Sequence, residues 1–275
     1  MNHFNVKQIK LLGHCANVAR AGSPKFPSLV FLMGQLQDIA GVSKVTDFLS
    51  DYYDLHILEL PGTGNTDPLV PGYSYKYIAD CLKSYVDMSE LSGFHLYGTS
   101  YATGIVLEYA KKYGQSLASA VISCAASFIP ERGVQPTIDM MHYCLRDPKS
   151  FARIYLEELS IDNDKVIRQK VIKRAAARHA SKHSDKQMQC FIYNATRILA
   201  YRAEDLHLIQ VPTLIIAGEF DPFITPKQCI DLVDAIPGSS YHCLANTDHL
   251  MQLQNPKGLA ELIVSFSRES HLLAA

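Results

Sequence analysis

The chain has 275 residues, of which 48% are hydrophobic and 19% charged, which suits one large domain or a domain with an inserted subdomain. Its formal net charge of −1 gives no reason to expect nucleic acid or an anionic membrane as a partner. The seven cysteines are scattered without CxxC pairs or Cys/His ligand spacing, which predicts reduced thiols, a cytoplasmic protein and no metal site. The chain start lacks a signal-peptide pattern, and no apolar run reaches the roughly 18 residues of a membrane span.

Short apolar runs alternate with helical patterns along much of the chain. Buried strands are predicted at 28–34, 55–62, 94–98, 119–127 and 212–218. Helices are predicted after the first three strands, at 42–53, 74–91 and 101–114. The apolar runs are continuous rather than alternating, as is typical of a parallel sheet covered by helices on both faces. The pattern therefore predicts an α/β fold, with an antiparallel hairpin before residue 28 at the sheet edge.

The alternation stops between about residues 128 and 205, where the pattern is helical throughout. A helical block of this length inside an α/β pattern predicts a lid inserted after one strand. The core is then expected at 1–127 and 206–275, with the lid at 128–205. A further strand at 240–245 and a last helix from residue 256 complete the predicted core.

The segment GTSYA, residues 98–102, joins a predicted strand to a predicted helix. A Ser at the tip of such a turn can act as a nucleophile when a base and oxyanion donors lie nearby. Gly98 and Ala102 are small enough to let the two backbones approach, and the helix N-terminus offers free N–H groups. The alternative is that Ser100 only caps the helix, and its place at a strand end favours the nucleophile.

His249 is the best candidate for the base among the eleven histidines. It follows turn-forming residues after the strand at 240–245 and precedes the last helix. Other histidines have simpler interpretations: packing within strands for His56 and His95, and solvation on a charged helix for His179 and His183.

The acid is expected after another strand, and the segment GEFDP offers Glu219 and Asp221. A carboxylate there can hold the imidazole tautomer and stabilise the imidazolium. Asp248 is adjacent to His249, but neighbouring side chains usually point apart. We therefore favour Asp221, with Glu219 as the second choice and a simple turn Asp as the structural alternative.

With Ser100, Asp221 and His249 in this order at strand ends, the chain resembles the α/β-hydrolase superfamily. The matching segments are FLMGQ, LHILELPGTGNTD, GTSYA, VPTLIIAGEFDPFITP and TDHLMQLQNP, and the resemblance covers roughly 28–127 and 206–268. It implies nucleophile, acid and base at these three positions, with acyl transfer through a covalent acyl-enzyme. No metal or organic cofactor is required.

The resemblance also implies an oxyanion hole made by the backbone N–H groups of Tyr101 and Gln35. Three positions depart from the family pattern: Met33-Gly34 replaces His-Gly, Glu59 replaces Asp before Pro-Gly, and Ala102 replaces Gly. The first departure means that other contacts must hold the Gln35 loop. The change at Glu59 lies at the sheet edge and is expected not to touch the chemistry.

The expected lid carries an apolar set that has two interpretations. The set consists of Met140, Met141, Tyr143, Leu145, Phe151, Ile154, Tyr155 and Leu159. These residues either form a small core of the lid itself or line an apolar acyl tunnel above Ser100, to which flexible Met side chains would adapt. The expected substrate is a small ester or thioester with an apolar acyl group.

A second part of the lid is basic, with eight cationic residues and one acid between 165 and 186. Arg168, Lys173, Arg174 and Arg178 belong to it. Either this face is simply solvated, or it docks an acidic partner such as an acyl carrier protein or coenzyme A. Docking would make the protein an acyltransferase or thioesterase. A ligand-binding α/β-hydrolase-fold protein with little or no turnover is the alternative from another class.

Overall fold

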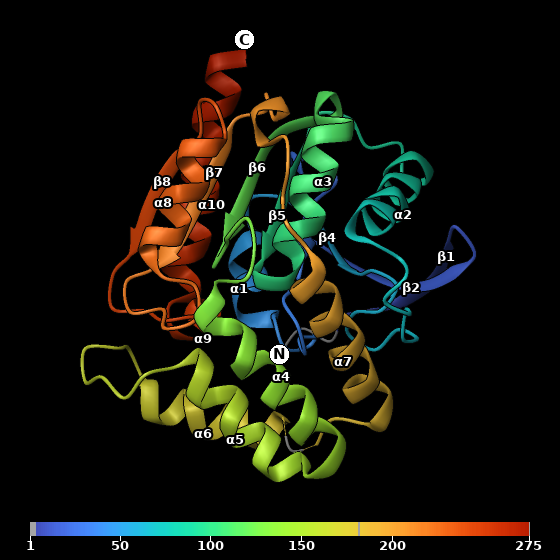
Figure 1. Ribbon diagram of the computed structural model, residues 1–275. Coiled ribbons are helices and arrows are strands. Elements are labelled where there is room, and N and C mark those ends of the chain that lie inside the picture. The colour runs from blue at the N-terminus through green and yellow to red at the C-terminus, as the bar shows by residue number, and fades with distance from the viewer. Residues whose placement is uncertain (1–3, 181, 275) are drawn as a thin grey trace.

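The computed structural model describes residues 4–180 and 182–274, and within them eight strands form one sheet (Figure 1). The strands are β1 (Lys7–Leu11), β2 (His14–Ala21), β3 (Ser28–Leu32), β4 (Asp54–Glu59), β5 (Phe94–Thr99), β6 (Leu117–Ser123), β7 (Thr213–Gly218) and β8 (Ser240–Leu244). Their order is β1-β2-β4-β3-β5-β6-β7-β8. The strands β3 to β8 are parallel, and β1 and β2 form an antiparallel hairpin at one edge. The predicted α/β fold and edge hairpin are confirmed.

Helices cover both faces of the sheet. They are α1 (Ser43–Leu49), α2 (Tyr75–Met88), α3 (Thr103–Tyr113), α8 (Pro226–Ala235), α9 (Met251–Gln254) and α10 (Pro256–Ala274). Because successive strand residues point to opposite faces, Val30 and Leu32 join the core beneath α2, α3 and α8, while Leu29 and Phe31 join the core beneath α1 and α10. Both sets are buried, which is why the strand sequences are continuously apolar.

Four helices are inserted between β6 and β7: α4 (Glu131–Arg146), α5 (Pro148–Leu159), α6 (Gln169–Ala180) and α7 (Asp185–Ala200). They lie together beyond one end of the sheet, in the lower part of Figure 1. The chain enters and leaves this helical insertion at one place, where the Ala203 N–H donates to the Ser127 carbonyl at 2.7 Å. The domain boundaries at 128 and 205 stay a prediction, and this hydrogen bond lies beside them.

The end of one strand and the start of one helix differ from the sequence prediction. The strand expected to run to residue 127 ends at Ser123, because Cys124 has a φ of +51° and leaves the extended region. The helix expected from residue 101 begins at Thr103, after a 3₁₀ turn at Ser100–Ala102. Both ends lie at the carboxyl edge of the sheet, where strands give way to loops.

All seven cysteines are free thiols. Among the helices of residues 4–180 and 182–274, none combines the length and apolar character that crossing a membrane requires.

Candidate active site

Three predicted residues meet at the carboxyl edge of the sheet. Ser100 follows β5, Asp221 follows β7 and His249 follows β8. His249 Nε2 lies 2.9 Å from Ser100 Oγ, and His249 Nδ1 lies 2.8 Å from Asp221 Oδ2. The structure thus joins the three side chains in one hydrogen-bonded chain at the edge where open parallel sheets hold their ligands.

Ser100 occupies a strained turn. Its φ of +51° lies in the left-handed region, which side chains other than Gly adopt at a cost of about 1–3 kcal/mol. The small flanking residues serve close packing, because a Cβ on Gly98 would lie 2.5 Å from Val106 Cγ2 and 3.3 Å from Ala102 Cβ. The turn therefore presents the hydroxyl at the tip of a sharp strand-to-helix junction.

The capping interpretation of Ser100 is wrong. Neither the 3₁₀ turn nor α3 has a side-chain hydrogen bond at its N-cap. The partner of Ser100 Oγ is His249. The N–H groups at the start of the helix are therefore not capped by a side chain, and their use as oxyanion donors stays a prediction.

His249 is buried, with 5% of its surface exposed. Burial by itself lowers the pKa of this imidazole, but the nearby carboxylates, Asp221 first and Asp248 with a smaller effect, together outweigh burial, so the net pKa is raised. The ring of Phe223 packs edge-on against the imidazole, with centroids 5.6 Å apart. A buried imidazole whose protonated form is stabilised by a carboxylate can accept a proton from Ser100 and pass it on.

Asp221, and neither alternative acid, faces His249. Its other carboxylate oxygen accepts the N–H groups of Phe223 and Ile224, at 2.9 and 2.8 Å. Glu219 is exposed and accepts the Asn246 N–H. The turn at Asp221-Pro222 therefore fixes the carboxylate from its own backbone.

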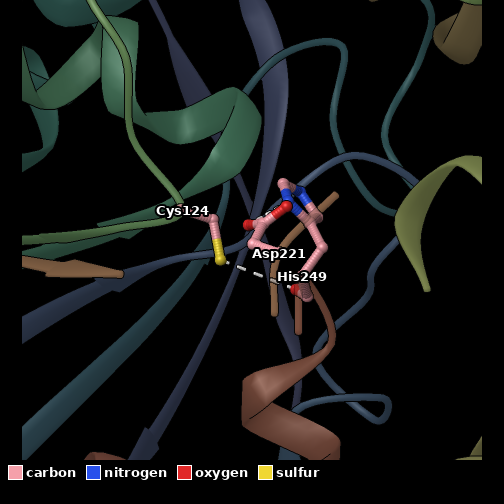
Figure 2. A group of neighbouring side chains, drawn as sticks. All are labelled: Cys124, Asp221 and His249. Atoms are coloured by element: carbon pink, nitrogen blue, oxygen red, sulfur yellow. Dashed lines mark hydrogen bonds and ion pairs between the residues drawn. The ribbon is translucent and has the colours of Figure 1, made fainter. Parts of the chain in front are cut away.

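Cys124 lies beside the Asp221–His249 pair (Figure 2), and its thiol donates to the His249 carbonyl oxygen at 3.6 Å. These three are the only groups in the described part of the chain whose potential metal-ligand atoms gather within 4.8 Å. Burial, together with the Asp221 charge, raises the thiol pKa well above its ordinary value. A protonated thiol is a poor metal ligand, so the chemistry of this cluster fits hydrogen bonding better than metal binding.

The loop after β3 carries Gln35, the expected second oxyanion donor. A Cβ on Gly34 would lie 3.5 Å from Ser100 Cβ, so the loop passes beside the Ser100 turn. Gln35 Nε2 donates to the Phe191 carbonyl at 2.8 Å, and the Tyr155 hydroxyl donates to the Gln35 carbonyl at 3.2 Å. The helical insertion thus supplies contacts that hold this loop. The Gln35 N–H makes no hydrogen bond within residues 4–180 and 182–274.

Arg197, on α7, was not singled out from the sequence, yet it holds the residue that follows Ser100. This guanidinium is buried, and it donates to the Tyr101 hydroxyl at 2.9 Å. Its other acceptors are the carbonyls of Leu69, Val70 and Tyr73 and the side chain of Asn194. A buried Arg in a helical sequence gives no signal of such a role, because most acceptors are backbone carbonyls that every residue carries.

Glu59 supports the segment that follows the Gln35 loop, whereas the sequence alone placed it at the sheet edge, away from the chemistry. Its buried carboxylate accepts the N–H groups of Ile39 and Asn65 and the side chain of Asn17, at distances of 2.7–3.0 Å. Ile39 belongs to the segment that continues from the Gln35 loop. The Glu therefore ties that segment to the loop after β4.

The insertion also holds the His249 loop. The Ser160 hydroxyl donates to Asp248 Oδ2 at 2.6 Å, and the Ile167 N–H donates to the Asn246 carbonyl at 2.9 Å. Asp248, the neighbour of His249, also accepts hydrogen bonds from Gln254 and Leu250. Asp248 is thus a support of the loop and not the acid of the hydrogen-bonded chain.

The apolar residues of the insertion mainly pack on one another. Met140 and Phe151 form a core with α7, and Leu159 belongs to a second small cluster. Leu145 is 73% exposed. Of the eight residues considered for an acyl tunnel, none lines the cavity at Ser100. The interpretation as a core of the insertion is therefore the one that the contacts support.

The basic segment at 165–186 is partly neutralised by acids that lie outside it. Lys170, Lys173 and Lys186 pair with Asp164, Asp162 and Asp67. Arg168 precedes α6, while Arg174 and Arg178 lie on it. Docking of an acidic carrier stays a prediction.

Two further histidine expectations are confirmed and one is wrong. His56 and His95 are buried. His183 lies between α6 and α7 rather than on a helix, is partly buried, and its Nε2 is 3.4 Å from the Leu36 carbonyl. The side chain of His179 lies outside the part that the structure describes.

A cavity of about 50 Å³ adjoins Ser100. Its walls are mainly apolar and include Ala126, Ile129, Ile198, Phe223 and Ile224. No Lys or Arg of the described residues lines it. The cavity therefore suits a small, uncharged, apolar group.

A parallel sheet with this hydrogen-bonded chain at its carboxyl edge, and with the Ser on a left-handed turn, defines an α/β hydrolase. The family model described as serine aminopeptidase, S33, matches residues 45–254. The chain belongs to this family, and the expected superfamily is confirmed.

Individual relatives are distant. The 2-hydroxy-6-oxononadienedioate/2-hydroxy-6-oxononatrienedioate hydrolase 2 of Pseudomonas putida is 25% identical over 227 residues, 78% of this chain and 77% of that protein. The enol-lactonase from Burkholderia xenovorans LB400 superposes with a TM-score of 0.82 at 16% identity, covering 94% of this chain and 99% of that one. The esterase from Exiguobacterium antarcticum gives 0.81 at 19% identity, covering 95% and 99%. These structural similarities establish the fold.

Proposed function

We propose that the protein is a serine hydrolase that cleaves a small, uncharged carboxylic ester or thioester through an acyl-enzyme on Ser100. The observation that carries this proposal is the hydrogen-bonded chain from Ser100 Oγ through His249 to Asp221, with Ser100 at a φ of +51°. A Ser hydroxyl becomes an effective nucleophile only beside a base that is itself oriented.

The reaction begins when His249 Nε2 takes the Ser100 proton and Oγ bonds to the carbonyl carbon of the substrate. The carbonyl π electrons move onto oxygen, which the N–H groups of Gln35 and Tyr101 stabilise. When the intermediate collapses, the bond to the leaving group breaks and His249 protonates that group. Water then attacks the acyl-enzyme with His249 as base, releasing the acid and restoring Ser100. Asp221 stabilises the imidazolium throughout.

An apolar acyl group is favoured by the walls of the cavity at Ser100. The related Pseudomonas putida enzyme is named for a dioate, whose carboxylates would need a counter-charge. Since no Lys or Arg of the described residues lines this cavity, we favour an uncharged substrate for this chain.

A fluorophosphonate probe tests the proposal directly. We expect it to label wild-type protein on Ser100, with the site read by peptide mass spectrometry, and to inactivate hydrolysis of p-nitrophenyl acetate. Ser100→Ala should abolish both labelling and turnover. Ser265→Ala, on the surface of α10, is the matched control and should behave as wild type.

The alternatives give different results. A ligand-binding protein without turnover would leave the acetate unhydrolysed. A carrier-dependent enzyme would prefer acyl-CoA or acyl-carrier substrates, and charge reversal at Arg174 and Arg178 would then raise KM for those substrates alone. If Ser100→Ala retains wild-type turnover, the mechanism is wrong.

A further inference from the structure

One tyrosine hydroxyl in the cavity of about 50 Å³ lacks a partner. Three tyrosines line this cavity: Tyr75, Tyr101 and Tyr201. The Tyr101 hydroxyl accepts from Arg197, and the Tyr201 hydroxyl donates to Glu108 Oε1 at 3.0 Å. Tyr75, the first residue of α2, is only 3% exposed, yet its hydroxyl makes no hydrogen bond within residues 4–180 and 182–274.

The Tyr75 hydroxyl is open to the cavity. Among the described residues, the polar side-chain atoms that are both unpaired and fully enclosed are Thr103 Oγ1, Gln252 Oε1 and Ser267 Oγ. The Tyr75 oxygen is unpaired but is not one of them, so it keeps contact with open space. Because Tyr75 is otherwise buried and lines the same cavity as Ser100, that open space is the cavity. A group bound there lies against both side chains.

The ring of Tyr75 is held by close neighbours. The ring centroids of Tyr101 and Tyr201 lie 5.2 and 4.6 Å from its own. Gly104 leaves room for the ring, because a Cβ at that position would lie 2.8 Å from Tyr75 Cδ1. The packed ring presents the hydroxyl to the cavity, so little side-chain freedom is lost when a ligand binds. Burial raises the pKa of Tyr75 well above its ordinary value, so the phenol keeps its proton and remains a donor.

The other walls limit what can accept this hydrogen bond. No charged side chain of the described residues lines the cavity, so nothing offsets the cost of burying a carboxylate there. The volume of about 50 Å³ is well below the roughly 150 Å³ that accommodates benzene. The cavity therefore suits a chain of a few atoms that carries one neutral acceptor, such as an ether, keto or hydroxyl oxygen.

We propose that Tyr75 is a substrate-binding residue whose hydroxyl donates to a neutral oxygen within the acyl group. The inference rests on the proposed function of Ser100. After the leaving group departs, the acyl group stays bonded to Ser100 Oγ, and the cavity that Ser100 and Tyr75 both line is beside that bond. A pure hydrocarbon chain would bury the Tyr75 hydroxyl without a partner, which is unfavourable. The preferred substrate is then an ester or thioester of a short, uncharged acid with one oxygen in its chain.

Two esters of matched shape test the hydrogen bond. The substrates are 4-nitrophenyl methoxyacetate and 4-nitrophenyl butyrate, which differ by an ether oxygen in place of one CH₂ group. The ether oxygen also activates the carbonyl, so the quantity compared between proteins is the ratio of the two kcat/KM values, from which intrinsic reactivity cancels. Tyr75→Phe should lower this ratio by about three- to tenfold, the range of one neutral hydrogen bond. An unchanged ratio would overturn the proposal.

Tyr201→Phe is the matched control, because its hydroxyl belongs to the same cavity wall but is paired with Glu108. It should leave the ratio at the wild-type value, whatever it does to the two rates. Tyr75→Phe should keep the wild-type midpoint of urea unfolding, since the hydroxyl that it removes has no partner in the described part of the protein. A lower midpoint, or an equal fall of the ratio in Tyr201→Phe, would assign the Tyr75 hydroxyl a structural role and refute the proposal.

A second pair of esters shows which part of the substrate meets Tyr75. In 2-methoxyethyl acetate and butyl acetate, the ether oxygen and the CH₂ group lie in the alcohol. The ratio of kcat/KM for this pair should be the same in wild type and Tyr75→Phe. If Tyr75→Phe lowers this ratio and leaves the ratio of the acyl pair unchanged, the hydroxyl meets the leaving group and the proposal is overturned.

The failure of this inference and the failure of the proposed function give different results. If fluorophosphonate labels Ser100 and both nitrophenyl esters are hydrolysed, but Tyr75→Phe leaves their ratio unchanged, the serine mechanism stands and the role of Tyr75 is refuted. If Ser100 is not labelled and neither ester is hydrolysed, the proposed function fails. Binding of methoxyacetamide and butyramide, followed by NMR, then decides for Tyr75. Tighter binding of methoxyacetamide that is lost in Tyr75→Phe supports its role, and no binding or equal binding refutes it.

Discussion

The close packing at Gly98 makes a quantitative prediction about the Ser100 turn. In Gly98→Ala, the new Cβ would lie 2.5 Å from Val106 Cγ2 and 3.2 Å from the Ala102 carbonyl oxygen. The φ of Gly98 is not left-handed, so the substitution adds crowding without backbone strain. Overpacking of this kind costs about 1–3 kcal/mol of unfolding free energy.

The crowding should also reduce activity, because α3 must move away from β5 and Ser100 lies between them. A displacement of about 1 Å at a reacting group can cost about 10²-fold in rate. We therefore expect Gly98→Ala to lower kcat/KM for p-nitrophenyl acetate by about ten- to a hundredfold. Urea unfolding and initial rates measure the two effects separately.

Val106→Ala provides the decisive partner variant, because it removes the nearest methyl group. Alone it should cost about 1–3 kcal/mol for two buried methyl groups. In the double variant the methyl group introduced by Gly98→Ala occupies part of the vacated space, so the total loss should be about 1–2 kcal/mol smaller than the sum. Strict additivity, or a Gly98→Ala protein as stable and active as wild type, would refute this account of the turn.

Two further predictions concern the carboxylates around the site. Because Asp221, with a smaller contribution from Asp248, raises the pKa of His249 against the effect of burial, and because the neutral imidazole is the base, activity should fall as pH drops through that raised pKa. Asp221→Asn should move the acidic limb of kcat/KM to lower pH and reduce kcat by roughly 10³–10⁴-fold; a limb that stays in place would show that another group controls it. Glu59→Gln replaces one accepting oxygen with an NH₂ group that faces N–H donors. It should therefore lower the free energy of unfolding in urea by about 1–3 kcal/mol, and it should lower kcat by a larger factor than it raises KM. Glu59→Asp should keep more of both, and a wild-type unfolding midpoint and kcat for Glu59→Gln would contradict the role of this carboxylate.

The fold and the central residues could be predicted because their signals are local. Continuous apolar runs mark the strands, and Ser100, Asp221 and His249 each follow such a run closely. The family match over 45–254 supports the same organisation. The catalytic roles of the three residues stay a prediction until the labelling experiment is done, as does the cytoplasmic location.

The supports of the site could not be predicted, because their partners are remote or are backbone groups. Gln35 meets Tyr155 and Phe191, which are 120 and 156 positions away. Glu59 accepts main-chain N–H groups, which leave no trace in the side-chain pattern. Gln252 and Gln254 are the same residue type two positions apart, and only the packing of the folded chain leaves one paired and the other not.

The hydrogen bonds from the helical insertion into the site have a consequence for recombination within this family. Tyr155 and Ser160 reach two different loops of the sheet, at Gln35 and at Asp248. A chimera that received another relative's insertion with crossovers near residues 128 and 205 would lose both donors, unless the incoming helices carried them at the same places. Exchange of the whole insertion would therefore disturb the Gln35 and Asp248 loops together, whereas substitutions on the cavity walls would leave these two hydrogen bonds in place.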